Sequence, residues 1–322
     1  MVAIEDILKS FGIEKEGTAV PIGNGHINKT YKVGSSYILQ KINTNVFKDP
    51  GIIARNLENA KQHLLKNHPD YLFIAPLKNI GEWRLYPYLE NTYTIENAGD
   101  IDQAYKAAKA FGRFGKFMQG ADLSKYKPTI ERFHDLQLRY DQLTEALDGS
   151  SDSLKASARN EINFAVKNES LVTHYNSIIK SKTLKPGIFH NDTKINNVLF
   201  DQHGNAVAVI DLDTVMEGYF IYDLGDLVRT LVSPVSEEEK DLDKIAVRKE
   251  FYDAVIEGYL SEMDVDRSLA SFAGQMMTYI MAIRFLADYL RGNTYYHVTY
   301  PDQNLVRAKN QLRLLELLQS GI

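Results

Sequence analysis

A predicted β-hairpin in the second half of the chain constrains the fold more than any other segment. Residues 198–200 (VLF) and 207–210 (VAVI) are short apolar runs with β-branched residues, and the turn-forming sequence DQHGN lies between them. Polar residues stand directly outside both runs, in HNDTKINN before the first and in IDLD at the end of the second. A folded hairpin would therefore bring Asp192 and Asn197 beside Asp211, although the two aspartates are 19 positions apart.

The composition is typical of a globular protein and excludes one class of partner. Of the 322 residues, 44% are hydrophobic and 25% are charged, which is enough apolar material for one large domain or two ordinary ones. The net charge of −5 leaves no excess of cations to neutralise phosphates. We therefore expect no nucleic-acid partner, while a local basic pocket for one small anion is compatible with this charge.

The chain contains no cysteine, which excludes a disulfide scaffold, a thiolate metal site and a cysteine nucleophile. Its first residues, MVAIEDILKSFGIEKEG, indicate an amphipathic helix with internal acids and not a signal peptide. No uninterrupted apolar run approaches the roughly 18 residues that cross a bilayer. We expect a cytoplasmic protein without a membrane partner. Nothing in the predicted helices requires a second copy, so a monomer would suffice and the oligomeric state is left open.

The predicted elements divide the chain into two parts. Residues 1–90 predict a small antiparallel sheet with one long helix in DPGIIARNLENAKQHLLKNHPD, and two of the strands are expected in LFIAPLKN and GEWRLYPYLEN. Residues 91–322 predict mainly helices, interrupted by the hairpin. This order favours an α+β fold of two lobes, and clefts between lobes are where small ligands usually bind.

The spacing His190-x-Asp192-x-Lys194-x-x-Asn197 resembles the catalytic loop of protein kinases, in which an Asn follows the Asp by five residues. That resemblance implies that Asp192 accepts the proton of the attacking hydroxyl, while Asn197 and Asp211 hold Mg²⁺, a cation that prefers oxygen ligands. Lys194 would balance charge on the transferred phosphoryl group. His190 is expected to pack and to hydrogen-bond the loop.

Each half of this pattern has a simpler interpretation when taken alone. HND is most often a turn or a helix cap, and IDLD is most often the end of a strand. The combination, with a hairpin of the right length between the halves, favours a functional role. Asp213 is compatible both with a second metal ligand and with a cap.

The chain as a whole resembles the aminoglycoside phosphotransferase and choline kinase superfamily, which has a two-lobed fold like that of protein kinases. The segment YDLGDLVR (222–229) is similar to the superfamily segment whose aspartate supports the catalytic loop, and Asp223 is the matching position. A helix cap is an equally good interpretation of Asp223, and the two roles are compatible.

A narrower resemblance, to the N-acetylhexosamine 1-kinases, rests on six segments in the same order. They are GNGHINKTY (23–31), YILQKINTNVF (37–47), HNDTKINN (190–197), IDLDTVM (211–216), RFLADYL (284–290) and YPDQNLVR (300–307). Those kinases transfer the γ-phosphate of ATP to the anomeric hydroxyl of GlcNAc or GalNAc. The resemblance implies sugar contacts from Asp192, Arg284 and Tyr295. An ion pair between Arg284 and Asp288, one turn along the helix, is the simpler interpretation of that arginine.

The N-terminal part departs from the usual kinase pattern. Gln40 stands where a phosphate-pairing lysine is usual, and Lys41 cannot simply replace it because neighbouring strand residues point to opposite faces. Glu58, at the position of the kinase helix glutamate, is left without a defined role. The resemblance implies two further contacts with the nucleotide. One is a short glycine loop over the phosphates, made of Gly23, Asn24, Gly25 and His26, and the other is a hinge for adenine within residues 85–90, at Tyr88, Leu89 and Glu90.

Other functions stay open from the sequence. One is a kinase of another small hydroxyl compound, such as a different sugar, choline or homoserine; a choline site needs an aromatic cage, and Arg284 would be a poor neighbour for that cation. Another is an inactive kinase fold that acts as a binding module. The choice between GlcNAc and GalNAc, the need for the acetyl group, and the nucleotide preferred are likewise left open.

Overall fold

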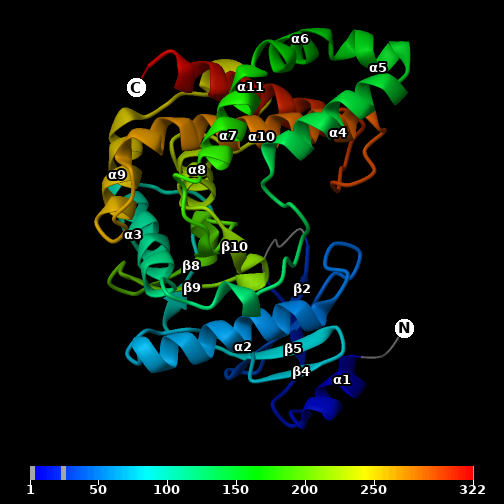
Figure 1. The fold of residues 1–322 in the computed structure, drawn as a ribbon. Coiled ribbons are helices and arrows are strands. Elements are labelled where there is room, and N and C mark those ends of the chain that lie inside the picture. Colours follow the sequence, from blue (N-terminus) through cyan, green and yellow to red (C-terminus); the bar gives the residue numbers. More distant parts are fainter. Residues whose placement is uncertain (1–3, 23–26, 322) are drawn as a thin grey trace.

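The computed structural model describes residues 4–22 and 27–321, which form two lobes (Figure 1). The N-lobe contains an antiparallel sheet in the order β1-β2-β3-β5-β4. Its strands are β1 (Ala19–Pro21), β2 (Lys29–Val33), β3 (Tyr37–Lys41), β4 (Lys78–Ile80) and β5 (Trp83–Pro87). The predicted strand in LFIAPLKN is wrong for residues 72–77, because the strand begins only at Lys78. The Leu77 N–H donates to the Leu85 carbonyl at 2.7 Å, and Pro76 before it has no N–H to donate.

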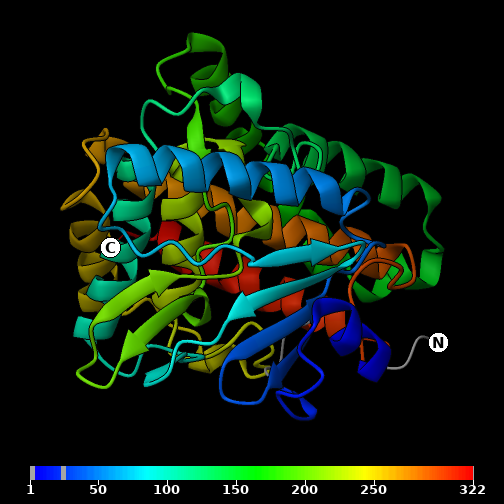
Figure 2. The same cartoon turned by 90° about the horizontal axis from the view of Figure 1, so that it is seen from below.

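Two helices flank this sheet (Figure 2). α1 (Ile4–Phe11) covers one face, where Leu8 and Phe11 pack with Leu39 and Leu85 in a small separate core. α2 (Pro50–Asn67) lies on the side of the C-lobe and contributes buried residues to the main core. Its start follows from the sequence DPG, because the Asp49 side chain accepts a hydrogen bond from the Gly51 N–H at 2.8 Å and proline suits the first turn.

The C-lobe is a helical layer packed around α10 (Ala270–Leu290), which contacts α4, α8 and α11. The other helices are α3 (Ile101–Phe117), α4 (Leu136–Gly149), α5 (Asp152–Ser157), α6 (Arg159–Lys167), α7 (Ser170–Ser181), α8 (Phe220–Leu231), α9 (Lys249–Leu260) and α11 (Gln303–Gln319). By length and composition alone, the segment Arg267–Leu290 could cross a membrane, yet 72% of its most apolar window is buried inside the fold. Its apolar character is thus accounted for by its place at the centre of the C-lobe.

Two small sheets lie beside α3, which contacts β7 and β9. The predicted hairpin forms β8 (Val198–Asp201) and β9 (Ala206–Val209), with Val198 opposite Val209, and β6 (Thr92–Tyr93) extends it. β7 (Gly187–Phe189) pairs with β10 (Met216–Gly218). Together these sheets fix both ends of the two polar segments, 190–197 and 210–215, that face the N-lobe.

Candidate functional site

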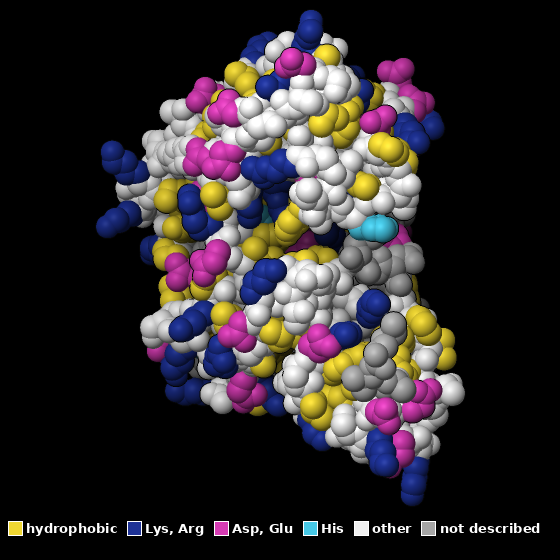
Figure 3. Space-filling view, turned by 90° about the vertical axis from the view of Figure 1, so that its right-hand side faces the viewer, with side chains coloured by type: hydrophobic (Ala, Val, Ile, Leu, Met, Phe, Trp, Pro, Cys, Tyr) yellow, Lys and Arg dark blue, Asp and Glu magenta, His cyan; other side chains and the backbone are white. Residues whose placement is uncertain are grey.

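The two polar segments meet between the lobes, as the predicted hairpin requires. The Ile210 N–H donates to the Asn197 carbonyl at 2.8 Å, and the Thr214 hydroxyl donates to the His190 carbonyl at 2.7 Å. Figure 3 shows a hollow on this side of the molecule between the upper and lower lobes, in which both acidic and basic side chains appear. The chain therefore concentrates charged groups of both signs in one cleft.

Asp192 lies at the centre of this constellation. Its Oδ1 is 3.1 Å from the Lys194 ammonium, and Asn197 Nδ2 donates to its Oδ2 at 3.2 Å and to its carbonyl at 2.9 Å. Burial acts to raise the pKa of Asp192, but the charge and the hydrogen bond of Lys194 oppose it, and that pKa lies below its ordinary value. The same ion pair raises the pKa of Lys194. Both groups are thus charged at neutral pH.

Asp211 is the acid at the far end of the hairpin, and its backbone takes the left-handed conformation, with φ at 57°. Asp211 is exposed, but the protein atoms around its carboxylate restrict the solvation of that group. This desolvation, then Asp213 and Asp192, raises the pKa of Asp211 to about 7, while Arg84 and Lys194 oppose the shift. A bound cation would remove this repulsion between carboxylates.

The residues present fit a magnesium ion. Asn197 donates through its amide nitrogen, and its Oδ1 has no hydrogen-bond partner among the described residues. With the carboxylate of Asp211 it offers two hard oxygen ligands. Over the same described residues, no group of three or more His, Cys, Asp or Glu side chains could hold a metal. This pair therefore suits a cation that takes its remaining ligands from phosphates and water, as Mg²⁺ does.

Asp213 has a different environment from Asp211. It is 2% exposed, forms an ion pair with Arg84 of β5, and accepts a hydrogen bond from Asn28 Nδ2 at 2.7 Å. Both partners come from the N-lobe. Of the two interpretations left open for Asp213, the structure supports neither a helix cap nor a carboxylate free to bind metal, because both oxygens are occupied by protein.

Buried side chains from α8 fix the segment 190–193. Asp223 accepts hydrogen bonds from the N–H groups of His190 and Asn191, at 3.2 and 2.7 Å. Burial raises the pKa of Asp223 to about 7, although these two bonds lower it. The N–H of Thr193 donates to Asp226 at 3.0 Å. The backbone around Asp192 is therefore rigid, because side chains of the buried helix α8 accept hydrogen bonds from N–H groups on both sides of this residue.

Two buried histidines also hold this loop. His190 Nε2 donates to the Ile210 carbonyl at 2.9 Å, and burial lowers its pKa. His134, which the sequence analysis did not single out, donates from Nε2 to the Asn191 carbonyl at 2.8 Å. Burial lowers the pKa of His134 to about 4. Both imidazoles are therefore neutral at pH 7, and His134 has no sequence signal because it lies 57 residues away from its partner.

Arg284 of α10 lies among aromatic rings. Its guanidinium is 5.3, 5.9 and 5.5 Å from the ring centres of Phe133, Tyr295 and Tyr296. No carboxylate pairs with it in the part of the chain that the structure describes. Tyr295 is 57% exposed and lies at the edge of the same group. The structure thus leaves a cation and a tyrosine open to a ligand.

The ion pair of Arg284 with Asp288 does not form, because the Asp288 carboxylate is fully used elsewhere. It accepts hydrogen bonds from the N–H groups of Thr294, Tyr295 and Tyr296, at 2.9, 2.8 and 2.9 Å. It also accepts one from Asn304 Nδ2 at 2.8 Å. Asp288 therefore folds the segment that carries Tyr295.

The predicted N-lobe contacts are placed in part. Tyr88 and Leu89 lie between the lobes, where the Tyr88 N–H donates to the Ser36 carbonyl at 2.8 Å and the Leu89 carbonyl accepts from Thr92 Oγ1 at 2.7 Å. Glu90 is exposed. The predicted glycine loop, Gly23 to His26, lies outside the described residues.

The three N-lobe residues whose roles the sequence left open have different partners. Gln40 binds Arg84, whereas Lys41 pairs with Glu82 at 2.8 Å and lies over the ring of Trp83, the single tryptophan of the chain. Glu58 is exposed and accepts a hydrogen bond from Gln62 at 2.9 Å. Glu58 thus pairs with no cation among the described residues.

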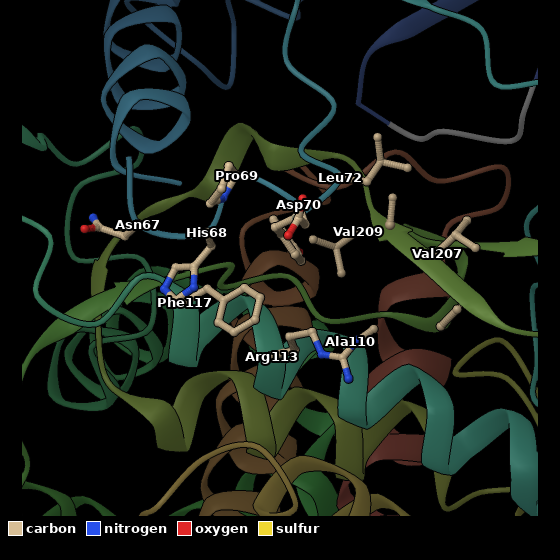
Figure 4. A pocket seen from close by; sticks show the side chains of 13 residues that line it. Asn67, His68, Pro69, Asp70, Leu72, Ala110, Arg113, Phe117, Val207 and Val209 are labelled. Atoms are coloured by element: carbon tan, nitrogen blue, oxygen red, sulfur yellow. The ribbon is translucent and has the colours of Figure 1, made fainter. Parts of the chain in front are cut away.

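A separate hollow of about 430 Å³ lies beside the end of α2, with α3 and β9 as its other walls (Figure 4). His68, Phe117 and Val209 are among the side chains that line it. None of the residues discussed above as catalytic, metal-binding or substrate-binding lines this hollow, so it is distinct from the interlobe cleft.

Comparison with known proteins agrees with this architecture. Residues 18–269 match the sequence model described as the phosphotransferase enzyme family. Among solved structures, the choline kinase of Streptococcus pneumoniae is similar over 97% of this chain and 99% of its own, with a TM-score of 0.57 and 13% identity. An aminoglycoside phosphotransferase from Alicyclobacillus acidocaldarius is similar over 95% and 94%, with a TM-score of 0.62 and 13% identity.

A third structure of this kind was solved with a nucleotide. It is an ADP-bound aminoglycoside phosphotransferase, similar over 98% of both chains with a TM-score of 0.59 and 13% identity. At such identities the likeness concerns the fold. The prediction of an α+β, kinase-like fold of two lobes is confirmed.

Proposed function

This chain belongs to the phosphotransferase enzyme family, and from that premise we propose that it transfers the γ-phosphate of ATP to the anomeric hydroxyl of an N-acetylhexosamine, GlcNAc or GalNAc. The guanidinium of Arg284 carries the choice of substrate, because no carboxylate among the described residues pairs with it. It lies against Phe133, next to the His134 that binds the Asn191 carbonyl beside Asp192. The N-lobe side of the cleft would hold the nucleotide, with the chain at Tyr88, Leu89 and Glu90 against adenine.

The nucleotide and the metal have defined places in this proposal. The ADP-bound structure of a similar fold supports the use of a nucleotide, which the cleft between the lobes would hold. Asn197 and Asp211 would hold Mg²⁺, which when bound supplies positive charge to the phosphates. Lys194, beside Asp192, would add a second positive charge on the acceptor side.

Asp192 would act as the base. Its lowered pKa keeps it ionised at neutral pH, and an anomeric hydroxyl is more acidic than an ordinary alcohol, so a carboxylate of this strength suffices to take its proton. The hydroxyl oxygen then forms the bond to the γ-phosphorus as the bond to the β-phosphate oxygen breaks. Asn197 and Lys194 hold the carboxylate in place, and most of the rate would come from this positioning.

The substrate class follows from charge. Arg284 has no acidic partner among the described residues, and burial together with Arg284 lowers the pKa of the nearby Arg139 to about 10. Because the charge of Arg284 acts on Arg139, the two guanidinium groups together disfavour a cation such as choline. They favour a substrate that offers oxygen atoms, such as sugar hydroxyls and an acetamido carbonyl, while Tyr295 and Tyr296 offer ring faces.

The same two arginines favour a second candidate, a kinase of a hydroxy amino acid such as homoserine. Its carboxylate could bind a guanidinium with two parallel hydrogen bonds. Testing choline and homoserine as substrates therefore distinguishes a site that accepts a cation from a site that binds a carboxylate.

A phosphorus-31 and proton NMR time course tests the proposal. Purified protein would receive ATP, Mg²⁺ and one compound at a time, from GlcNAc, GalNAc, glucose, galactose, mannose, choline and homoserine. We expect a sugar 1-phosphate resonance with GlcNAc or GalNAc that grows faster than with the unacetylated hexoses, and growth at least roughly 100-fold slower with Asp192→Asn. Faster phosphorylation of homoserine or choline would overturn the sugar assignment and keep the phosphotransferase.

A further inference from the structure

A buried arginine in the N-lobe sheet has no role in the mechanism above. Arg84 of β5 is 1% exposed, and it lies directly opposite Gln40 of β3 in the strand register. Neighbouring side chains of a strand point to opposite faces, so Leu39 and Leu85 face α1, whereas Gln40 and Arg84 face the C-lobe. This alternation directs the guanidinium toward the cleft.

The guanidinium is held by both lobes at once. Its Nε donates to Gln40 Oε1 at 2.8 Å, and its Nη1 pairs with Asp213 of the C-lobe. Gln40 is itself oriented, because its Nε2 donates to Thr30 Oγ1 at 3.0 Å. Residues of the neighbouring strands β2, β3 and β5 therefore orient the Arg84 guanidinium toward the Asp213 carboxylate.

The other oxygen of Asp213 is bound by the N-lobe too. Asn28 Nδ2 donates to it at 2.7 Å, and Asn28 Oδ1 accepts the Asn43 N–H at 2.9 Å. Asp213 stands two positions after Asp211, and one helical turn, Leu212–Thr214, includes it. Any movement of Asp213 would thus move the backbone that orients Asp211.

We propose that Arg84 and Asp213 form an interlobe latch that positions Asp211 for the metal, and that Arg84 with Gln40 replaces a lysine at position 40. Arg84 acts as a positioning residue, since its hydrogen-bond and ion-pair partners among the described residues are Gln40 and Asp213. An unpaired charge at this depth would be costly, so each partner keeps the other in place. This inference rests on the proposed metal role of Asp211 and not on the identity of the sugar.

The test measures Mg²⁺-dependent nucleotide binding, which needs no sugar. Calorimetric titration with ADP would be repeated over a range of Mg²⁺ concentrations for wild type, Arg84→Gln and Asp213→Asn. We expect both variants to need at least fivefold more Mg²⁺ for half-maximal enhancement of ADP binding, with little change in metal-free ADP affinity. A purely structural role would lower the melting temperature without moving the Mg²⁺ requirement.

A swap across the strand pair makes the test specific. The double variant Gln40→Lys with Arg84→Gln places the cation on β3 and the amide on β5, facing the same Asp213. We expect it to restore at least half of the Mg²⁺ response, which also decides the question if Arg84→Gln alone does not fold. Lys41→Gln is the matched control, because Lys41 pairs with Glu82 and lies on the other face, and it should behave as wild type.

An unchanged Mg²⁺ requirement in folded Asp213→Asn and Arg84→Gln would overturn the latch. Failure of the swap to restore any response would overturn the replacement of a lysine at position 40. If wild type binds ADP but Mg²⁺ has no effect, the proposed metal role is wrong, and the latch with it. NMR results with different sugars affect neither conclusion.

Discussion

Asp192 is the residue on which the proposed chemistry depends. Asp192→Asn keeps the size of the side chain but removes the base, so we expect turnover to fall by roughly 10²–10⁴-fold. ATP binding, measured by calorimetry, should stay within about twofold of wild type. Normal turnover in this variant would contradict the assignment of Asp192.

Arg284 should act on the acceptor and not on the nucleotide. Arg284→Met keeps the apolar stem and removes hydrogen bonds to the sugar, so kcat/KM for the sugar should fall by roughly 10–100-fold, with KM for ATP nearly unchanged. Arg291→Met is the matched control, since Arg291 lies just after the same helix and pairs with exposed Glu145. Equal loss in both variants would contradict a specific role for Arg284.

The sequence predicts the contacts of some site residues and not those of others. The segment from His190 to Asp211 is predictable because its members lie on one hairpin, and local spacing determines their meeting. The contact of Arg84 with Asp213 is not predictable, because it joins the two lobes and a sequence does not show which faces of the lobes meet. One signal was available for Arg84: it is a charged residue inside the strand WRLYP, and a charge buried there needs a partner.

The segment 294–296 is held to α10 by one carboxylate. Asp288→Ala would leave the N–H groups of Thr294, Tyr295 and Tyr296 without their acceptor, so we expect a loss of roughly 2–4 kcal/mol in the free energy of unfolding. Hydrogen exchange should accelerate most in this segment. Asp302→Ala, at a side chain that caps no N–H of α11, should change neither quantity. Exchange that rises equally across the C-lobe would contradict this local role.

Elements were predictable where they bury one face regularly. The helical spacing in IDQAYKAAKAFGRFGKFMQG corresponds to α3, and the DPG start corresponds to the first turn of α2. The failure at residues 72–77 has a physical reason, since an apolar run containing Pro76 can pack without joining a sheet. The fold of the Asp288 loop was not foreseen, because a carboxylate that binds backbone N–H groups leaves no side-chain pattern.

The stability of the whole molecule should depend on pH through its buried histidines. His134 has a folded pKa of about 4, below the ordinary value of 6.5, so only the unfolded chain takes up a proton between these values. His134 therefore lowers stability as the pH falls from about 6.5 to 4, by a total of roughly 3 kcal/mol. Burial shifts the pKa of His190 in the same direction, while the raised pKa of Asp223 acts in the opposite sense.

His134→Gln isolates the contribution of His134. Glutamine can donate to the Asn191 carbonyl but does not titrate, so denaturant unfolding of this variant should lose less stability than wild type between pH 6.5 and 4. Above pH 7 the two curves should run parallel. His203→Gln serves as the control, because His203 lies in the exposed turn of the hairpin and should give the wild-type slope. Identical slopes for His134→Gln and wild type would contradict the shift.

The order of the two lobes is the part of the architecture that the sequence foretold best. A short β-rich region followed by a helical region with one hairpin left few alternatives to a kinase-like fold. The placement of the lobes against each other depends on contacts such as Asp213 with Asn28, which link residues 185 positions apart. Such pairs have no local periodicity, so only the folded chain reveals them.

The intrinsic fluorescence of Trp83 reports on one lobe of the protein. This single indole lies in the N-lobe sheet, beside the Tyr31 ring and the Lys41 ammonium group. Most of the helical signal in circular dichroism must come from the larger lobe. Tryptophan emission and ellipticity therefore follow different halves of the same chain. If both signals change at one denaturant concentration, the lobes unfold as a single cooperative unit; if emission changes first, the small sheet opens while the helices persist.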